Sequence, residues 1–479
     1  MDDLDFIILN NEVQQLITND QAWHYRVIPK SIGHNFIELF VENTFFTEDH
    51  RAELELLTGK EIKITPLSSD KIKVALGTYY RRKHPSSSPK TVEIEVKHSE
   101  DFLNRLIFET RELGSSDIHI ETYKEKCRIR IRIDGLLIEK CAVRKLDYPG
   151  LINKIKIKAN LDISEKRLPQ DGRIYFQSGQ HQFDIRVSVL PTLYGEKIVL
   201  RLLNNEAGNI DIYQLGFSEK QLSDYLLGIK KTHGIVLISG PTGSGKTTTL
   251  YATLKILNNE KTNILTIEDP VEYTLEGVNQ VQLKEAIGLN FAGALKTFLR
   301  QDPDIIMLGE IRDSETAQMA IRASLTGHLV LSTIHTNSAW GTVSRLVDMG
   351  VPPFLLASTL NTTAAQRLIR LLCPGCKELQ PLENSIYPPG FTPYAVLKSH
   401  YIAKGCEHCF YTGYKGRKAV YEIIPIDYEL ADQIKNNHLS IDSILKNRNI
   451  TTLSQNAFRL FEEGLTSMNE IYPILLNSY

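Results

Sequence analysis

The sequence lacks long apolar runs and any strong excess of one charge. No run reaches the roughly 18 apolar residues that a membrane-spanning helix needs, so we expect no such helix. A formal net charge of −2 argues against a protein whose main task is to wrap nucleic acid. The opening stretch, MDDLDFIILNNEVQQ, has an acidic head and a short apolar run, unlike a signal or transit peptide. These absences make the cytosol the expected location.

Cysteine is scarce as well, with 6 among 479 residues. Four of the cysteines form two C-x-x-C pairs, and these are Cys373, Cys376, Cys406 and Cys409. Two such pairs supply the four thiolates of a closed, tetrahedral zinc site, so we expect a zinc-binding element over 373–409. A redox role is the alternative, but the pairs have no thioredoxin-like βαβ context. His408 is an alternative ligand that four cysteines make unnecessary.

The other two cysteines, Cys127 and Cys141, flank a predicted hairpin, KCRIRIRIDGLLIEKC. If the DG dipeptide forms a two-residue turn, Cys127 pairs with Ala142 and Cys141 pairs with Arg128. This register places the two sulfurs on opposite faces of the hairpin, so we expect free thiols.

Composition and hydrophobic pattern predict five regions. Residues 1–80 mix short helical and strand patterns, and the Pro- and Ser-rich stretch 81–94 is typical of a linker. A helix followed by strands of alternating polarity predicts an α+β domain over 95–204. The pattern then changes to an α/β domain over 205–425, and 426–479 is predicted to be helical.

Short, wholly apolar runs alternate with helical stretches in the α/β region. Unalternated runs of this kind are typical of a parallel sheet that helices cover on both faces. The predicted strands are GIVLISG (234–240), NILTIED (263–269), DIIMLGE (304–310) and HLVLSTIH (328–335).

A phosphate-binding loop follows the first of these strands. GPTGSGKT matches the pattern G-x-x-x-x-G-K-[ST], with a strand before it and a helix after it. The backbone N–H groups of such a loop wrap nucleotide phosphates, and the helix directs its positive end at them. Lys246 is expected to reach the β- and γ-phosphates, and Thr247 to hold Mg²⁺. The expected nucleotide-binding residues are Gly240, Pro241, Thr242, Gly243, Ser244, Gly245, Lys246, Thr247 and Thr248.

Polar clusters stand at the ends of the other three predicted strands. They begin at Glu268, Gly309 and Thr333, and the carboxyl ends of strands are where open α/β sheets bind ligands. A single acidic residue at a strand end is more often a solvated cap, but four converging strand ends favour one site. At the second cluster, Gly309 occupies the place where many phosphate-loop ATPases have an Asp that meets magnesium.

These residues resemble the motor ATPases of type II secretion and type IV pilus assembly. The matching stretches are TIEDPVEY (266–273), DIIMLGEIRD (304–313) and ASLTGHLVLSTIHTNSA (323–339), with SSDIHIE and LDISEKRLPQDGRI upstream. The resemblance implies a RecA-like P-loop motor domain, a preceding PAS-like α+β domain, a small N-terminal recruitment domain and a zinc-binding insertion. It also favours an assembly motor, since the tetracysteine element is typical of that type.

The resemblance assigns roles that spacing leaves open. It implies that Glu310 replaces the missing Asp, positioning Mg²⁺ through water and polarising the attacking water. Glu268, Asp269 and Glu272 are implied to help Glu310 position Mg²⁺ and the attacking water.

Histidines and arginines also receive roles from the resemblance. His335, and with less support His328, are implied to sense the γ-phosphate. Arg186 and Arg201 are implied to approach that phosphate as the α+β domain moves. Their positions on predicted strands, taken alone, would instead make them charged side chains on the outer face of the sheet. Arg417 is implied to reach a neighbouring subunit's nucleotide.

The resemblance further implies the partners. It predicts a homo-hexamer at the cytoplasmic face of the inner membrane, a platform protein and a membrane-anchored recruitment protein, with ATP, Mg²⁺ and Zn²⁺ as cofactors. Type II secretion, type IV pilus extension and DNA uptake all remain open. A zinc-ribbon helicase and a nonhydrolysing ATP-binding scaffold are the rival interpretations. Near-neutral charge and the lack of basic-aromatic stretches oppose the helicase.

Overall fold

The computed structural model describes two compact units, residues 1–90 and 91–479. The described residues are 13, 16–33, 35–42, 45–69, 71–72, 75–76, 93–94, 99–178, 181–203, 211–438 and 440–476. Of the predicted linker 81–94, only 93–94 lie within these ranges. Among the described residues, no helix has the length and apolar character to cross a membrane.

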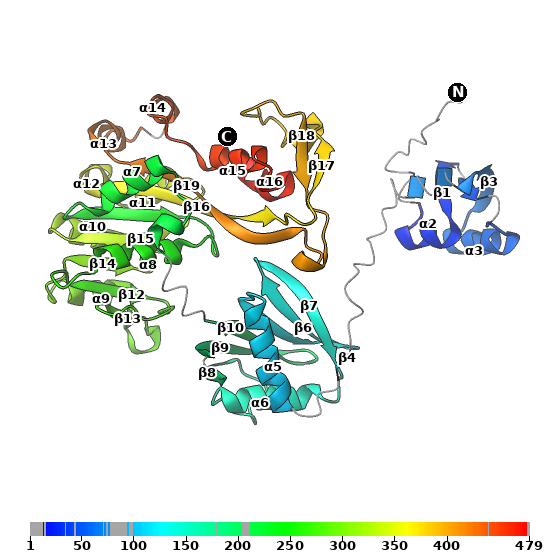
Figure 1. Ribbon diagram of the computed structural model, residues 1–479, viewed down its shortest axis with the longest axis horizontal. Coiled ribbons are helices and arrows are strands. Elements are labelled where there is room, and N and C mark those ends of the chain that lie inside the picture. Colours follow the sequence, from blue (N-terminus) through cyan, green and yellow to red (C-terminus); the bar gives the residue numbers. More distant parts are fainter. Residues whose placement is uncertain are drawn as a thin grey trace. The chain divides into compact units, whose positions relative to one another are not determined.

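The first unit contains a three-stranded sheet in the order β1-β2-β3 (Figure 1). Its elements are α2 (Asn19–Tyr25), β1 (Val27–Ile32), β2 (Phe36–Glu42), α3 (Glu48–Thr58) and β3 (Glu61–Leu67). β2 is antiparallel to β1 and parallel to β3, so α3 forms the crossover. Thr18 and Thr47 cap the two helices with their hydroxyls. Leu39, Leu54 and Ile62 form the fully buried centre of this unit.

The second unit begins with a seven-stranded sheet in the order β4-β7-β6-β5-β10-β9-β8. Its elements are β4 (Glu93–Ile94), α5 (Ser99–Glu112), β5 (Asp117–Thr122), β6 (Cys127–Ile133), β7 (Leu136–Val143), α6 (Tyr148–Lys158), β8 (Gln170–Ser178), β9 (His181–Thr192) and β10 (Gly195–Leu202). Every second strand residue, such as Ile118 and Ile129, packs with Leu103 and Ile152 of the two helices. The helices therefore cover one face, and the alternating polar residues occupy the other.

The predicted register of the β6–β7 hairpin is wrong. An irregularity between Ile129 and Arg130 pairs Cys127 with Val143, and Ile129 with Cys141. Both sulfurs consequently belong to the same buried core instead of opposite faces. The thiols are nevertheless free, as expected.

The third sheet of the chain has the order β13-β12-β14-β15-β11-β16-β19 (Figure 1). Its strands and the surrounding helices are α7 (Glu219–Ile229), β11 (Gly234–Ser239), α8 (Lys246–Leu257), β12 (Ile264–Glu268), β13 (Asn279–Gln282), α9 (Phe291–Phe298), β14 (Ile305–Leu308), α10 (Ser314–Leu325), β15 (Leu329–Ile334), α11 (Gly341–Asp348), α12 (Pro353–Thr359), β16 (Leu360–Leu372) and β19 (Tyr414–Pro425). Neighbouring strands are parallel except for β19, which runs antiparallel to β16.

Helices cover both faces of this sheet. Ile235 and Leu237 of β11 pack in a core with residues of α9 and α10. Val236 and Ile238 point to the opposite core, which α7 and α8 complete. The four predicted strands all occur in this parallel sheet, and the mixed α/β class is confirmed.

The edge formed by β16 and β19 carries the cysteine-containing excursion and leads to the C-terminal helices. The elements there are β17 (Glu378–Pro381), β18 (Ser399–Ile402), α13 (Tyr428–Lys435), α14 (Asp442–Asn447), α15 (Leu453–Glu462) and α16 (Met468–Leu476). Phe458 and Phe461 of α15 are buried in the core that also contains Ile369 of β16. The C-terminal helices are therefore part of the same folded body as the parallel sheet.

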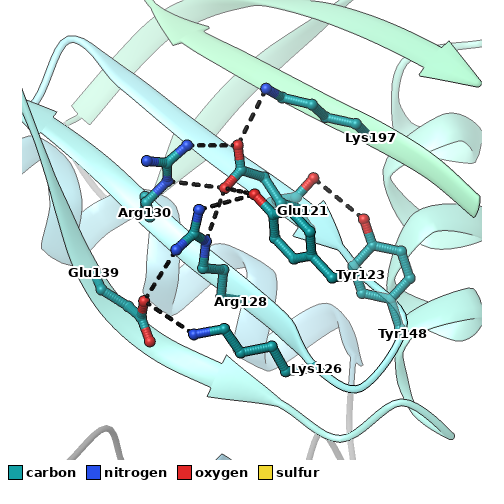
Figure 2. Close-up of polar contacts among 9 residues, drawn as sticks. Glu121, Tyr123, Lys126, Arg128, Arg130, Glu139, Tyr148 and Lys197 are labelled. Carbon is teal, nitrogen blue, oxygen red and sulfur yellow. Dashed lines mark hydrogen bonds and ion pairs between the residues drawn. The ribbon is translucent and has the colours of Figure 1, made fainter. Parts of the chain in front are cut away.

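A buried carboxylate organises the polar face of the α+β sheet (Figure 2). Glu121 is 4% exposed, and Arg130 donates to its two oxygens at 2.8 Å each. Arg128 and Lys197 add contacts at 3.1 Å each. Burial acts to raise the pKa of Glu121, but the hydrogen bonds from Arg130, Lys197 and Arg128 lower it to about 2. One carboxylate thus links three neighbouring strands, β5, β6 and β10.

We expect Glu121→Gln to lower the free energy of unfolding by about 1–3 kcal/mol at pH 7. The folded-state pKa of Glu121 lies below its unfolded value of 4.5, so its stabilisation is complete above pH 4.5. That stabilisation is lost as the pH falls from 4.5 toward about 2. Urea unfolding at pH 7, 5 and 3.5 should therefore show a difference between variant and wild type that shrinks with acid.

Glu125→Gln is the matched control, because Glu125 lies on the same hairpin and is 84% exposed. Its effect should stay within about 0.5 kcal/mol at every pH. A Glu121→Gln cost that does not change with pH would contradict the assigned charge interaction.

Candidate nucleotide-binding site

The loop between β11 and α8 is the first part of the candidate site. β11 is buried along its length and ends at Ser239, and α8 begins at Lys246. Gly240 has a φ of +151°, and a Cβ there would lie 2.5 Å from the carbonyl oxygen of Gln366. The buried Ser244 hydroxyl has no hydrogen-bond partner among the described residues. The loop thus combines a closely packed backbone, the Ser244 hydroxyl and the positive end of α8. These three features fit the phosphates of a nucleotide.

Lys246 folds back over this loop. Its Nζ donates to the carbonyl oxygens of Gly240 at 2.8 Å and Pro241 at 3.1 Å. Burial lowers the pKa of Lys246, and the charge of Glu310 acts in the opposite direction. Thr247 follows at the surface, so an ammonium and a hydroxyl stand on consecutive residues. The other predicted loop residues are Thr242 and Gly243, which are exposed, and Gly245 and Thr248, which are half-buried.

Side chains that follow β12, β14 and β15 lie close together at one edge of the sheet. Glu310 is 16% exposed, and one of its oxygens contacts the guanidinium of Arg312. Its other oxygen lies 3.4 Å from Nε2 of His335. Arg312 also lies 3.6 Å from the carboxylate of Asp269. The parallel pairing thus brings Asp269, Glu310 and His335 into one cluster, as the strand ends predict.

Gly309 stands where β14 leaves the sheet. A Cβ at this position would lie 3.4 Å from both the Cα of Glu268 and the carbonyl oxygen of Ile267. These are ordinary van der Waals distances, so a Cβ at position 309 would fit against the backbone of β12. Glu310, one residue later, is the carboxylate that faces His335.

Glu268 has a different environment from Asp269, because it is 3% exposed. Its oxygens accept hydrogen bonds from Tyr251, from Thr266 at 2.7 Å and from Gln280 at 3.1 Å. The sequence interpretation missed Tyr251 and Gln280, which lie outside the motif stretches. Tyr251 lies on α8, five residues after Lys246, and this spacing gave no sign of a contact with Glu268.

The two predicted arginines lie side by side on β9 and β10, where Arg186 pairs with Arg201. Arg186 lies 3.2 Å from the carboxylate of Glu272 and donates to the carbonyl oxygen of Val271. Arg201 is instead 3.0 Å from the carboxylate of Asp117, within its own sheet. One arginine therefore contacts the loop after β12, and the other does not.

The structure does not bring His328 or Arg417 to the phosphate loop of this chain. The backbone of His328 accepts a hydrogen bond from Gly234, at the start of β11, whereas the phosphate loop follows the end of that strand. The His328 ring contacts the carbonyl oxygen of Ala323 at 2.9 Å. Arg417 lies 3.5 Å from the carboxylate of Asp134 in the β6–β7 turn.

The four cysteines of the two C-x-x-C pairs converge at the open end of the β16–β19 pair. All four Sγ atoms lie within 4.8 Å of one another. Three of the separations, Cys373–Cys406, Cys376–Cys409 and Cys406–Cys409, are 3.9, 3.7 and 3.8 Å. A tetrahedron with Zn–S bonds of about 2.3 Å has edges of about 3.8 Å, so the thiolates fit zinc. N–H groups of Cys406 and Gly413 also donate to Cys409 Sγ.

Comparison with known proteins identifies relatives along most of the chain. Residues 94–473 match the family model described as Type II/IV secretion system protein. The chain is 40% identical to the type IV pilus assembly ATPase PilB of Myxococcus xanthus, over 96% of this chain and 86% of that protein. It is 46% identical to the type II secretion system protein E of Pectobacterium carotovorum, over 78% of this chain and 74% of that protein.

Solved structures agree with this result. The ATPase DotB of Legionella pneumophila covers 81% of this chain over 99% of its own length, with a TM-score of 0.61 and 21% identity. The pilus retraction motor PilT with bound ADP covers 78% of this chain over 96% of its own length, with a TM-score of 0.54 and 26% identity. The DotB similarity, at 21% identity, supports the fold alone.

We expect about one zinc ion per chain, and we expect Cys376→Ser to abolish this content. Loss of the metal leaves the 373–409 excursion without its crosslink, so hydrogen exchange there should accelerate while exchange in α8 stays unchanged. Metal analysis by mass spectrometry, together with hydrogen exchange before and after chelation, measures both effects.

Cys141→Ser is the control, because Cys141 is a free thiol outside the cluster. That variant should retain its zinc. If the zinc is fully removed by a chelator and hydrogen exchange over 373–409 does not change, the metal has no structural role.

Proposed function

The chain belongs to the Type II/IV secretion system protein family, and we propose that it is a hexameric ATPase that powers assembly of a type IV pilus or type II secretion pseudopilus. The observation that carries this proposal is the meeting of Lys246, Asp269, Glu310 and His335 at one edge of the parallel sheet. The relatives identical at 40% and 46% are named for pilus assembly and type II secretion.

In this proposal, different residues of the site have different roles in the hydrolysis of ATP. The loop over 240–247, with its Lys246, holds the phosphates. Thr247 would hold a magnesium ion, which would neutralise charge on those phosphates. Glu310 polarises the attacking water, and His335, 3.4 Å from it, lies where a terminal phosphate can be sensed. Asp269, 3.6 Å from Arg312 in the same cluster, would add a further carboxylate near such a metal ion.

The arginines supply positive charge against the transition state. Arg186 already contacts the loop that follows β12, and Arg201 is the neighbouring cation on β10. Arg201 must leave Asp117 to reach a phosphate, which requires movement of the α+β domain. An arginine that acts in this way accelerates phosphoryl transfer by roughly 10³–10⁵-fold.

We propose the same partners and arrangement as the resemblance implies. The hexamer lies at the cytoplasmic face of the inner membrane beneath a platform protein. Residues 1–80 bind a membrane-anchored recruitment protein, 95–204 close on the nucleotide and 205–425 form the motor. Residues 426–479 form the C-terminal helical region, and the zinc element at 373–409 is structural. Within this proposal, Arg417 reaches a neighbouring subunit's nucleotide and His328 senses the γ-phosphate.

The rival function is a nucleic-acid motor. The PilT structure is that of a pilus retraction motor, and the relatives of 40% and 46% identity are named for pilus assembly and type II secretion. We therefore expect DNA and RNA to leave the ATPase rate unchanged. A strong stimulation by either polymer would favour the rival.

We expect Glu310→Gln to lower kcat for ATP by roughly 10²–10⁴-fold, because an amide cannot accept the proton of the attacking water. The affinity for a nonhydrolysable ATP analogue should remain near that of the wild type. Phosphate release and analogue binding, measured on the assembled protein, test the two statements.

Glu315→Gln is the matched control, since Glu315 lies on the adjacent helix α10 and is 63% exposed. Its kcat should equal that of the wild type. Substantial turnover in Glu310→Gln would show that another group is the catalytic carboxylate.

A further inference from the structure

The polar network around Tyr251 is outside the machinery described so far. Tyr251 lies on α8, the helix that begins at Lys246, and its side chain is fully buried. Its hydroxyl donates to Oε2 of Glu268, at the end of β12. The same hydroxyl oxygen accepts from the backbone N–H of Glu272 at 3.3 Å. One phenol therefore joins the phosphate-loop helix to both ends of the loop over 268–272.

Gln280 completes the network from β13. Its Nε2 donates to Oε1 of Glu268 at 3.1 Å and to the carbonyl oxygen of Tyr273 at 3.1 Å. Its Oε1 accepts from the N–H of Leu275 at 2.7 Å. The loop after β12 is consequently held at three backbone positions, those of Glu272, Tyr273 and Leu275.

The chemistry of the network fixes the direction of each hydrogen bond. Burial, and then the negative charge of Glu268, raise the pKa of Tyr251, so the phenol stays protonated. The single proton of the phenol goes to the carboxylate, which leaves the oxygen lone pairs for Glu272. Thr266 and Gln280 occupy the other carboxylate oxygen of Glu268. Both oxygens of Glu268 are thus engaged inside the protein.

The loop that this network holds, 268–272, also contacts Arg312 and Arg186 through its carboxylates. Asp269 lies 3.6 Å from Arg312, which in turn contacts Glu310. Glu272 lies 3.2 Å from Arg186 of the α+β domain. The Tyr251 network therefore holds the loop that carries Asp269, a neighbour of the Arg312–Glu310 pair, but does not include Glu310 itself.

We infer that Tyr251 and Glu268 form a positioning pair for ATP hydrolysis. The hydroxyl–carboxylate contact fixes the 268–272 loop to α8, so that Asp269 and Glu272 keep a set distance from Lys246. This inference rests on the proposed ATPase function. It gives Glu268 a role different from direct metal or water contact, and it adds Tyr251, which no motif includes.

The test compares two buried tyrosines: Tyr251, which lies on α8 and bonds Glu268, and Tyr225, which bonds a residue of α8. Tyr251→Phe removes the hydroxyl that holds Glu268, and we expect kcat to fall about tenfold to 10²-fold, as for misplaced catalytic groups. The Kd of a nonhydrolysable ATP analogue and the Tm should stay close to wild type. Tyr225→Phe is the matched control, because the fully buried Tyr225 bonds Thr253 of the same helix at 2.8 Å. Its kcat should be unchanged.

A double-mutant cycle on kcat distinguishes positioning by Tyr251 through Glu268 from a purely structural role of Tyr251. If Tyr251 acts through Glu268, Tyr251→Phe should lower kcat in the wild type but not further in a Glu268→Gln background. Full additivity of the two losses would overturn the inference. Equal kcat in Tyr251→Phe and Tyr225→Phe would overturn it as well, and so would a Tyr251→Phe loss confined to Tm or analogue affinity.

Failure of the proposed function gives a different result. In that case the wild type itself hydrolyses no ATP, and Glu310→Gln is indistinguishable from it. An active wild type, an inactive Glu310→Gln and an unaffected Tyr251→Phe would refute only the positioning pair.

Discussion

Parallel pairing of β12, β14, β15 and β11 is the constraint on which the candidate site depends. Because these strands run in one direction, the residues that follow them meet at one edge of the sheet. Each strand is fixed by side chains that alternate between two buried cores, so a shift by one residue would move every side chain into the core packed for its neighbours. The distance between Glu310 and His335 is therefore set by the packing of the whole domain.

Helix α8 extends this constraint from the sheet to the loops. Its first residue, Lys246, belongs to the phosphate loop, and Tyr251 lies about one and a half turns further along. Tyr251 bonds the loop that carries Asp269 and Glu272, and Glu272 contacts Arg186. A displacement of α8 by bound phosphate would thus reach the α+β domain through a short series of direct contacts.

The sequence predicted the parts of this arrangement that are local or that follow from strand direction. The phosphate loop, the four buried strands and the convergence of Asp269, Glu310 and His335 depend on short stretches with a strong pattern. The β6–β7 register was missed, because the irregularity after Ile129 leaves no signature in an alternating run. Tyr251 and Gln280 were missed, because contacts between residues 29 apart depend on tertiary packing. The roles assigned to His328 and Arg417 remain predictions, and the structure brings neither residue to the phosphate loop of this chain.

The space beside Gly309 has a consequence for how such sites can change. A Cβ at position 309 would lie 3.4 Å from the Cα of Glu268 and from the carbonyl oxygen of Ile267, which is ordinary van der Waals contact. Gly309 is also absent from the glycines with positive φ, so its backbone does not demand a glycine. Packing at the end of β14 therefore leaves room for the first atom of a side chain beside Glu310. A single substitution can add a carboxylate at position 309 while Glu310 is still present, so the two arrangements of carboxylates are one residue exchange apart.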